Sequence, residues 1–392
     1  MEFSAQDLLW LLLPLAAASG WWIARLEHKH RQARGARDFP SAYFKGLNFL
    51  LNEQPDKAIE VFVKVLEVDS ETVETHLALG NLFRRRGEVE RAIRIHQNLI
   101  ARPTLDKEQR SQALLELGQD YLKAGLFDRA ENLFLELAEY RLHNRQALHF
   151  LMQIYQQEKE WEQAISTCRK LARVAGKNLD DVIAQYYCEV AEQATTHGDA
   201  SAARSAIRQA LSADRQCVRA SILLGRLEAA QGRNSEALKA WKRIEEQDAH
   251  YLGEVVEEMV ESFKALNDED GLYEYLRAAL QTHGGVSLMV ALASLIEKRQ
   301  GVDAAEEFVV EWLHREPSVH GLHYLIDLHL TEANASNKDD LTLLRSIIGA
   351  LVEQQRGYVC RQCGFKGKSL HWQCPSCKRW NAMKPFFGGA ID

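Results

Sequence analysis

Cysteine is scarce in this chain, and its distribution argues against a disulfide-stapled fold. Seven cysteines occur in 392 residues, and an odd number cannot pair completely within one chain. Cys168, Cys188 and Cys217 stand singly in helical-looking sequence, where a thiol usually behaves as a small buried apolar group. Free thiols are typical of a reducing compartment. We therefore expect the bulk of the chain to lie in the cytoplasm.

Signatures of catalysis are also lacking. The sequence contains no Walker phosphate loop, no nucleophile elbow and no dinucleotide-binding fingerprint. His320, His323 and His329 share one predicted helix and could form a metal-binding face, but no H-E-x-x-H pattern accompanies them. Histidines that simply pack or hydrogen-bond within helices explain them better. The sequence therefore predicts a protein that is not an enzyme.

Strand-like alternation is absent before residue 357, and a helical repeat takes its place. A Leu-Gly pair, an aromatic residue, a turn with Gly or Asp and an alanine return about every 34 residues. Successive alanines are 34, 38, 34, 39 and 34 residues apart. Small residues at these positions would let paired helices pack closely. The residues assigned to this packing are Gly46, Ala58, Gly80, Ala92, Gly118, Ala130, Ala164, Ala203, Gly225 and Ala237.

This pattern resembles the tetratricopeptide repeat, whose two-helix units stack into an all-α superhelical solenoid. Weaker helical pairs are predicted at about residues 253–283, 286–315 and 319–353, which gives roughly eight or nine units. An irregular all-α bundle is the alternative. Repeat solenoids commonly bind partners on their concave surfaces.

Charge is distributed unevenly along the chain. Residues 38–355 hold 36 Lys and Arg against 51 Asp and Glu, whereas both ends are basic. Nucleic-acid binding requires basic surface, so we expect no nucleic-acid partner for this middle region. An acidic surface favours basic or mixed peptide partners, and a solvated face without a binding role is the alternative.

The N-terminal region contains one long apolar run, LLWLLLPLAAASGWWI at residues 8–23. Extended back to Phe3, it is long enough to cross the hydrocarbon core as a helix. A cleaved signal peptide would need basic residues before the run, where Glu2 and Asp7 stand. Basic residues follow it instead, so the positive-inside rule places the rest of the chain in the cytoplasm. The predicted anchor residues are Leu8, Trp10, Leu11, Leu12, Leu13, Trp21, Trp22 and Ile23, and the topology-setting residues are Arg25, Lys29, Arg31, Arg34 and Arg37.

The other four cysteines lie close together near the C-terminus. Cys360 and Cys363 form one C-x2-C turn, and Cys374 and Cys377 form another. Two such turns can close on one tetrahedral metal ion and leave no open position, which suits structure or electron transfer better than hydrolysis. Four thiolates accept either iron or zinc. His371 could replace one thiolate, although the four cysteines already suffice.

These two turns resemble the knuckles of rubredoxin-like and zinc-ribbon domains. Lys378 stands where rubredoxin has a glycine, and the insert between the knuckles is shorter, which favours a structural site. The module is too small to bury a core, so metal binding should supply its folding energy. Basic and aromatic residues such as Lys366, Trp372 and Trp380 fit either a nucleic-acid ribbon or a ribbon packed on the acidic repeats. We favour packing, because the aromatic side chains require burial.

The sequence thus divides into four regions: an anchor at 1–24, a basic linker at 25–38, a repeat region at 39–355 and a four-cysteine domain at 356–392. This order, the start MEFSAQDLLWLLLPLAAASGWWIAR and the segment CRQCGFKGKSLHWQCPSCKRW resemble the lipopolysaccharide assembly protein B family of Gram-negative bacteria. The resemblance covers the whole chain. It carries over the anchor and the metal quartet, but no partner-binding residues.

The resemblance implies an inner-membrane adaptor that faces the cytoplasm. Such an adaptor serves the membrane protease FtsH and promotes turnover of the deacetylase LpxC, which commits precursors to lipid A. A membrane partner that senses lipopolysaccharide would restrain it, and homo-oligomer formation is left open. The competing interpretations are a rubredoxin-type electron-transfer protein and a nucleic-acid-associated scaffold.

Overall fold

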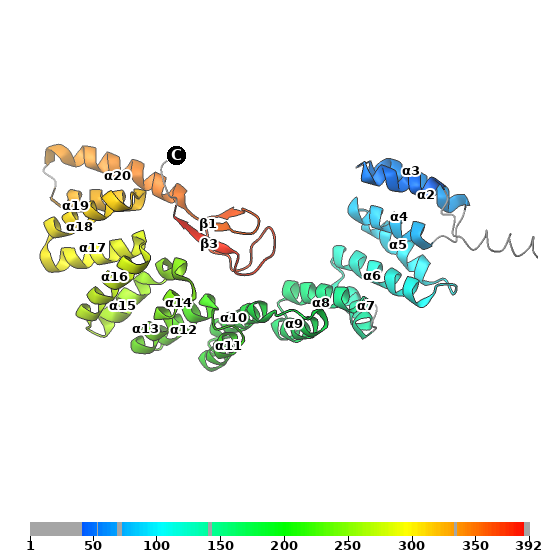
Figure 1. Cartoon of the computed structure of the whole chain (residues 1–392), viewed down its shortest axis with the longest axis horizontal. Helices are drawn as coiled ribbons and strands as arrows, with labels where there is room; N and C mark the ends of the chain where they lie inside the picture. The colour runs from blue at the N-terminus through cyan, green and yellow to red at the C-terminus, as the bar shows by residue number, and fades with distance from the viewer. Residues whose placement is uncertain (1–40, 53, 69–72, 140–142, 333–334, 388–392) are drawn as a thin grey trace, which may run out of the picture. The chain divides into compact units, whose positions relative to one another are not determined.

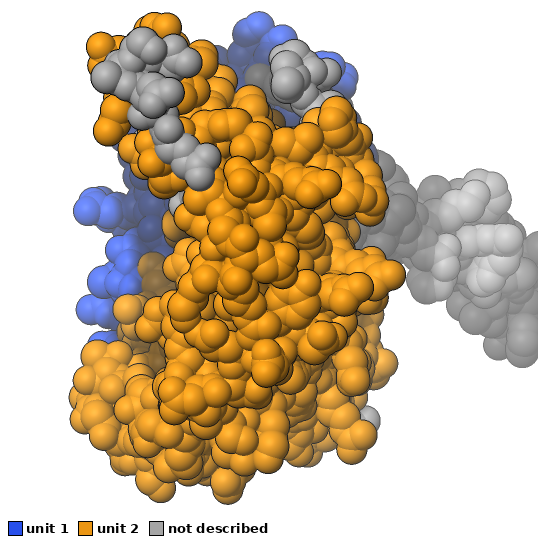
Figure 2. Space-filling model, turned by 90° about the vertical axis from the view of Figure 1, so that its left-hand side faces the viewer, with its two compact units in different colours: residues 1–147 blue, residues 148–392 orange. Residues whose placement is uncertain are grey.

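The computed structural model describes residues 41–387, apart from residues 53, 69–72, 140–142 and 333–334 (Figure 1). The chain forms two compact units, residues 1–147 and 148–392 (Figure 2). The predicted anchor and the basic residues that follow it lie outside the described residues. Within the described part of the chain, every helix is too short or too polar to span a bilayer.

Unit 1 is built from helical pairs. Short turns join the two helices of a pair, and Gly87 and Gly125 adopt positive φ angles of 85° and 75° in two of these turns. Glycine takes this left-handed conformation without the penalty that a Cβ atom adds. The helices are α2 (Ser41–Leu51), α3 (Pro55–Val68), α4 (Val73–Arg85), α5 (Val89–Ile100), α6 (Lys107–Lys123), α7 (Phe127–Glu139) and the beginning of α8 (Asn144–Glu158).

Unit 2 continues the same helical pairing and ends in a small sheet. Its helices are α9 (Trp161–Ala175), α10 (Asp180–Thr196), α11 (Ala200–Ala213), α12 (Val218–Ala230), α13 (Asn234–Lys242), α14 (Ile244–Asp248), η1 (Ala249–Glu254), α15 (Val256–Ala265), α16 (Glu269–His283), α17 (Val286–Gln300), α18 (Val302–Arg315), α19 (Val319–Glu332) and α20 (Ala335–Gln355). The three weak pairs predicted after residue 253 are present as α15 with α16, α17 with α18, and α19 with α20. The predicted all-α repeat fold is confirmed.

The repeat glycines lie where a side chain has no room. In four repeats the glycine of the first helix faces a ring from the second helix, and a Cβ atom there would overlap that ring. The closest approaches for such a Cβ would be 2.1–2.7 Å, well inside van der Waals contact. The pairs are Gly46 with Phe62, Gly80 with His96, Gly118 with Phe134 and Gly225 with Trp241. The repeat alanines at 58, 92, 130, 164, 203 and 237 are fully buried.

One interruption departs from the predicted repeat. The helix that contains Ala237 was expected to run for roughly a dozen residues, but α13 has nine and the chain then bends through α14 and η1. The Asp248 carboxylate accepts a hydrogen bond from the His250 backbone N–H and so begins a new helical turn at η1. This bend places Tyr251 in a fully buried position next to the C-terminal ribbon.

We expect Gly118→Ala to destabilise unit 1, because the added Cβ would lie 2.5 Å from Cε1 of Phe134. Overpacking of this kind costs about 1–3 kcal/mol in free energy of unfolding. Thermal unfolding followed by circular dichroism measures the change. Lys123→Ala, at an exposed position on the same helix, is the control and should leave the midpoint nearly unchanged. Equal midpoints for the two variants would show that the helices have room to separate at Gly118.

Candidate metal centre and ribbon interface

A three-stranded antiparallel sheet frames the metal site. Strand β1 (Arg356–Cys360) lies between β2 (Lys366–Gly367) and β3 (Met383–Phe387). Cys360, the last residue of β1, pairs with Met383 of β3. The first knuckle therefore begins directly at the end of the central strand. We refer to residues 356–387 as the ribbon.

The two knuckles have the same backbone hydrogen bonds. In the first, the Gly364 N–H donates to the Cys360 carbonyl at 2.9 Å, and in the second the Lys378 N–H donates to the Cys374 carbonyl at 2.9 Å. Each buried cysteine also donates its own N–H to a carbonyl five residues later, at 2.8 Å and 2.9 Å. The two turns are therefore near copies of one another, each presenting two thiols to a common centre.

Lys378 occupies the position at which the sequence departs from the rubredoxin pattern. Its φ angle is 58°, close to the 76° of Gly364 at the same place in the first knuckle. A lysine can adopt this left-handed conformation at a modest steric cost. The departure therefore changes the residue without changing the turn.

The four thiols are arranged as a tetrahedral metal site requires. The Sγ atoms of Cys360 and Cys377 are 3.7 Å apart, those of Cys363 and Cys374 are also 3.7 Å apart, and all four lie within 4.8 Å of one another. A zinc–sulfur bond of about 2.3 Å corresponds to a sulfur–sulfur separation of roughly 3.8 Å in a regular tetrahedron. The residues fit one metal ion held by four cysteines, and this prediction is confirmed.

The surroundings affect the ionisation of the two exposed ligand thiols in opposite directions. Cys360 and Cys374 are buried, whereas Cys363 and Cys377 are exposed. The backbone N–H of Phe365 donates toward the Cys363 sulfur and lowers the pKa of that thiol to about 6. The thiolate is the form that binds a metal. In Cys377, the backbone donor of Arg379 is outweighed by desolvation and hydrogen bonds with the other cysteines, which raise the pKa of that thiol to about 11, so it would lose its proton as the metal binds.

The histidines considered as ligands lie elsewhere. His371 Nε2 is 3.1 Å from the Ser369 hydroxyl oxygen, His323 lies 3.4 Å from Asp327 on the same helix, and His329 lies 3.5 Å from Glu306 of α18. Among the residues that the structure describes, the cysteine quartet is the one group whose ligand atoms converge in this way.

The ribbon packs on the helices of unit 2 through its two tryptophans. Trp372 stacks on Tyr251 of η1 with ring centroids 5.3 Å apart and an interplanar angle of 27°. Trp380 meets Tyr186 of α10 edge to face at 5.8 Å and 87°. Both tyrosines are fully buried. Aromatic packing thus provides the burial that the ribbon requires.

A buried arginine from the helices lies between the two tryptophans. The Arg219 guanidinium carbon of α12 is 5.8 Å from the Trp372 ring centroid and 6.0 Å from that of Trp380. Arg219 is 2% exposed, and its Nη2 bonds Glu189 at 2.8 Å and Glu192 at 2.9 Å. The expected pairing of a basic ribbon residue with an acidic residue of the helices occurs between Lys384 and Asp248, whereas at the two tryptophans the helices supply the cation. The rings attract it through their negative faces.

Polar contacts from the end of α14 and from η1 hold the strands of the ribbon in place. The Tyr251 hydroxyl donates to the Met383 carbonyl at 2.6 Å, and the Tyr358 hydroxyl donates to Glu254 at 2.8 Å. Lys384 Nζ lies 2.5 Å from an Asp248 oxygen. Partial burial opposes ionisation of Asp248, but the hydrogen bonds from Lys384 and His250 and the charge of Lys384 together outweigh it and lower the pKa of this carboxyl. The charged pair therefore persists at neutral pH.

Sequence reasoning missed Tyr186, Arg219 and Tyr251 as ribbon contacts. Each lies more than a hundred residues from its ribbon partner, so no local spacing marks it. The one available signal was the break in the repeat after Ala237, because η1 carries Tyr251 there.

Family models and sequence relatives agree with this architecture. Residues 358–385 match the model of a rubredoxin metal binding domain, and residues 75–111, 115–178 and 194–250 match tetratricopeptide repeats. Lipopolysaccharide assembly protein B of Escherichia coli K12 is 39% identical over 97% of this chain and 98% of that protein. The protein of the same name in Haemophilus influenzae is 37% identical over 97% of this chain and 98% of its own length. A solved tetratricopeptide repeat protein from Parabacteroides merdae covers 79% of this chain and 98% of its own, with 13% identity and a TM-score of 0.35.

We expect the double variant Cys360→Ser with Cys363→Ser to lose its bound metal and to expose the ribbon to proteases. The reason is that metal binding supplies folding energy that about thirty residues cannot supply alone. Elemental analysis gives metal per chain, and limited proteolysis reports on the ribbon. Ser376→Ala, an exposed non-ligand within the second knuckle, is the control and should retain the ion. Full metal content in the double variant would contradict the four-cysteine site.

Tyr251→Phe should loosen the ribbon without removing the metal. The substitution keeps the stacking on Trp372 but leaves the buried Met383 carbonyl without its donor, at a cost of about 1–3 kcal/mol. Hydrogen exchange in β3 should therefore become faster. Tyr273→Phe, on α16 and away from the ribbon, is the matched control. Unchanged exchange in β3 would mean that this hydrogen bond contributes nothing to docking.

Proposed function

The chain belongs to the lipopolysaccharide assembly protein B family, and we propose that it is a membrane-anchored adaptor that regulates lipopolysaccharide synthesis through proteolysis. The observation that carries this proposal is the extent of the likeness, which covers 97% of this chain and 98% of its relatives. A likeness of that extent includes the repeats and the four-cysteine domain together. We therefore assign this function to the whole chain and not to one of its domains.

In this proposal, the protease is FtsH and the client is the deacetylase LpxC. The chain brings the two together, and LpxC turnover limits the supply of lipid A precursors. A lipopolysaccharide-sensing membrane protein restrains the adaptor. These partners follow from the resemblance of the sequence to the family.

The structure supports an adaptor through the kind of surfaces it provides. Helical repeats give extended surfaces suited to protein partners. The metal site is closed by four cysteines, which suits a structural ion. The ribbon is committed to the helices through Trp372 and Trp380, so the metal stabilises one conformation of the repeat array. Binding, rather than chemistry at the ion, is the role that this arrangement favours.

Confinement to the bilayer is the second part of the mechanism. A helix at residues 1–24 would restrict the adaptor to the plane in which a membrane protease diffuses. The effective concentration of one for the other then rises without any new contact. The basic residues from Arg25 to Arg37 would keep the repeats on the cytoplasmic side of the inner membrane.

Deletion of residues 1–23 should lengthen the half-life of LpxC at native expression, because adaptor and protease would then meet only by free diffusion. Quantitative immunoblotting after a block of protein synthesis measures that half-life. A variant in which an unrelated membrane helix replaces residues 1–23 is the control and should restore turnover if tethering is sufficient. The proposal fails if LpxC decays equally fast with and without the anchor.

A further inference from the structure

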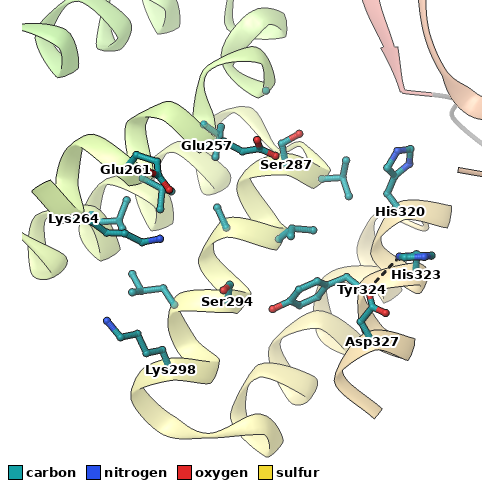
Figure 3. A pocket seen from close by; sticks show the side chains of 18 of the residues that line it. Glu257, Glu261, Lys264, Ser287, Ser294, Lys298, His320, His323, Tyr324 and Asp327 are labelled. Carbon is teal, nitrogen blue, oxygen red and sulfur yellow. Dashed lines mark ion pairs between the residues drawn. The ribbon is translucent and has the colours of Figure 1, made fainter. Parts of the chain in front are cut away.

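A cleft runs along α15, α17 and α19, beside the ribbon. Its volume is about 680 Å³, and a smaller hollow of about 370 Å³ continues it between these helices and the ribbon. Both share residues including Glu257, Ser287 and His320, so the two hollows form one continuous site, which we call the ribbon cleft. Figure 3 shows its larger part, with side chains from three helices turned toward a common space.

The ribbon cleft combines an apolar floor with polar groups along it. Residues that form the apolar part are Val260, Leu272, Val290, Ala291 and Leu295. Ser287 and Ser294 lie on the same helix, α17, and Tyr324 of α19 points toward Ser294 (Figure 3). An extended peptide needs both kinds of surface, because its side chains are partly apolar and its backbone requires hydrogen-bond partners.

Negative charge predominates in the ribbon cleft. Its lining includes six carboxylates and three lysines, namely Glu254, Glu257, Glu258, Glu261, Glu269, Asp327, Lys264, Lys298 and Lys368. Lys298 already pairs with Glu269, and Asp327 with Arg345 and His323. Those pairs neutralise one side of the cleft and leave Glu254, Glu257, Glu258 and Glu261 against Lys264 and Lys368, a small excess of negative charge that lies mainly on α15.

The α15 carboxylates have few partners. Glu257 and Glu261 are exposed one helical turn apart, and the described residues place no ion pair on either. One oxygen of Glu258 accepts a hydrogen bond from Arg226 at 2.8 Å, while its other oxygen is buried and lacks a partner among the described residues. A cationic group in the ribbon cleft would offset this charge.

We propose that the ribbon cleft binds an extended segment of a partner protein that carries a lysine or arginine between apolar residues. The cationic side chain lies against Glu257 and Glu261, and the apolar neighbours lie on Val290 and Ala291. The proposal rests on the adaptor function and specifies where, and by what chemistry, the adaptor holds a protein partner. An anionic ligand such as a nucleic acid would meet repulsion from α15.

The ribbon forms one wall of this site. Tyr358, Lys368 and Phe386 line the smaller hollow, and Phe386 is 49% exposed there. This exposed aromatic ring lines the same hollow as Glu257 and provides a further apolar contact for the bound segment. Partner binding therefore depends on a docked ribbon, which links the metal site to recognition.

Selection from a phage library of short random peptides, against the full chain in lipid nanodiscs, tests the proposal. Enriched peptides should contain one Lys or Arg flanked by apolar residues. Fluorescence anisotropy with a selected peptide should show that Glu257→Lys with Glu261→Lys weakens binding about tenfold or more, since two attractions become repulsions. Ala291→Trp, which fills the floor, and Phe386→Ala, which removes the wall contact, should also weaken it.

The control variant also reverses two glutamate charges, but at positions outside the ribbon cleft. Glu274→Lys with Glu307→Lys changes exposed residues of α16 and α18 and should bind the peptide as the native chain does. All variants should keep their helical circular dichroism and their metal. Equal binding by the Glu257/Glu261 variant, enrichment of acidic peptides, or no enrichment over empty nanodiscs would each overturn the proposal. Such a failure, with anchor-dependent LpxC turnover intact, would leave the adaptor function standing.

Discussion

Arg219 carries a buried positive charge at the place where the ribbon meets the helices. Glu189 and Glu192 bind it from one side, and the faces of Trp372 and Trp380 lie near it on the other. A buried charge is costly unless it is paired and shielded from water in good geometry. The helices alone supply the carboxylates, and the ribbon supplies the rings. Neither part can satisfy Arg219 fully without the other.

The metal site determines whether those rings are available. Trp372 precedes Cys374 by two residues, and Trp380 follows Cys377 by three, so both tryptophans flank the second knuckle. Their positions depend on a turn that folds only when its thiols are held together. The effect of the ion thus extends beyond the four sulfur atoms to the packing of α10, α12 and η1. A closed site is suited to this, because it fixes a shape and leaves no coordination position open for substrate.

The packing of the ribbon also explains how binding surface is divided within unit 2. The ribbon covers residues of α10, α12 and η1. In contrast, residues of α15, α17 and α19 line an open hollow beside the ribbon. The irregular turn at η1 separates these two regions, since it carries both Tyr251 toward the ribbon and Glu254 toward the smaller hollow. The break in the repeat at η1 therefore provides both a contact site for the ribbon and one edge of the ribbon cleft.

The sequence by itself determined the features that depend on short spacings. Two C-x2-C turns predicted the metal quartet, because each turn needs only local backbone geometry. A period of about 34 residues predicted the helical pairs, because each unit packs on its neighbours and repeats the same small residues. The tertiary structure alone decided where the ribbon docks, that the helices supply the cation between the two tryptophans, and which carboxylates gather beside the ribbon. Those contacts join residues that are far apart in the sequence, 136 positions for Lys384 with Asp248, and a single contact between distant segments leaves no periodic pattern in a sequence.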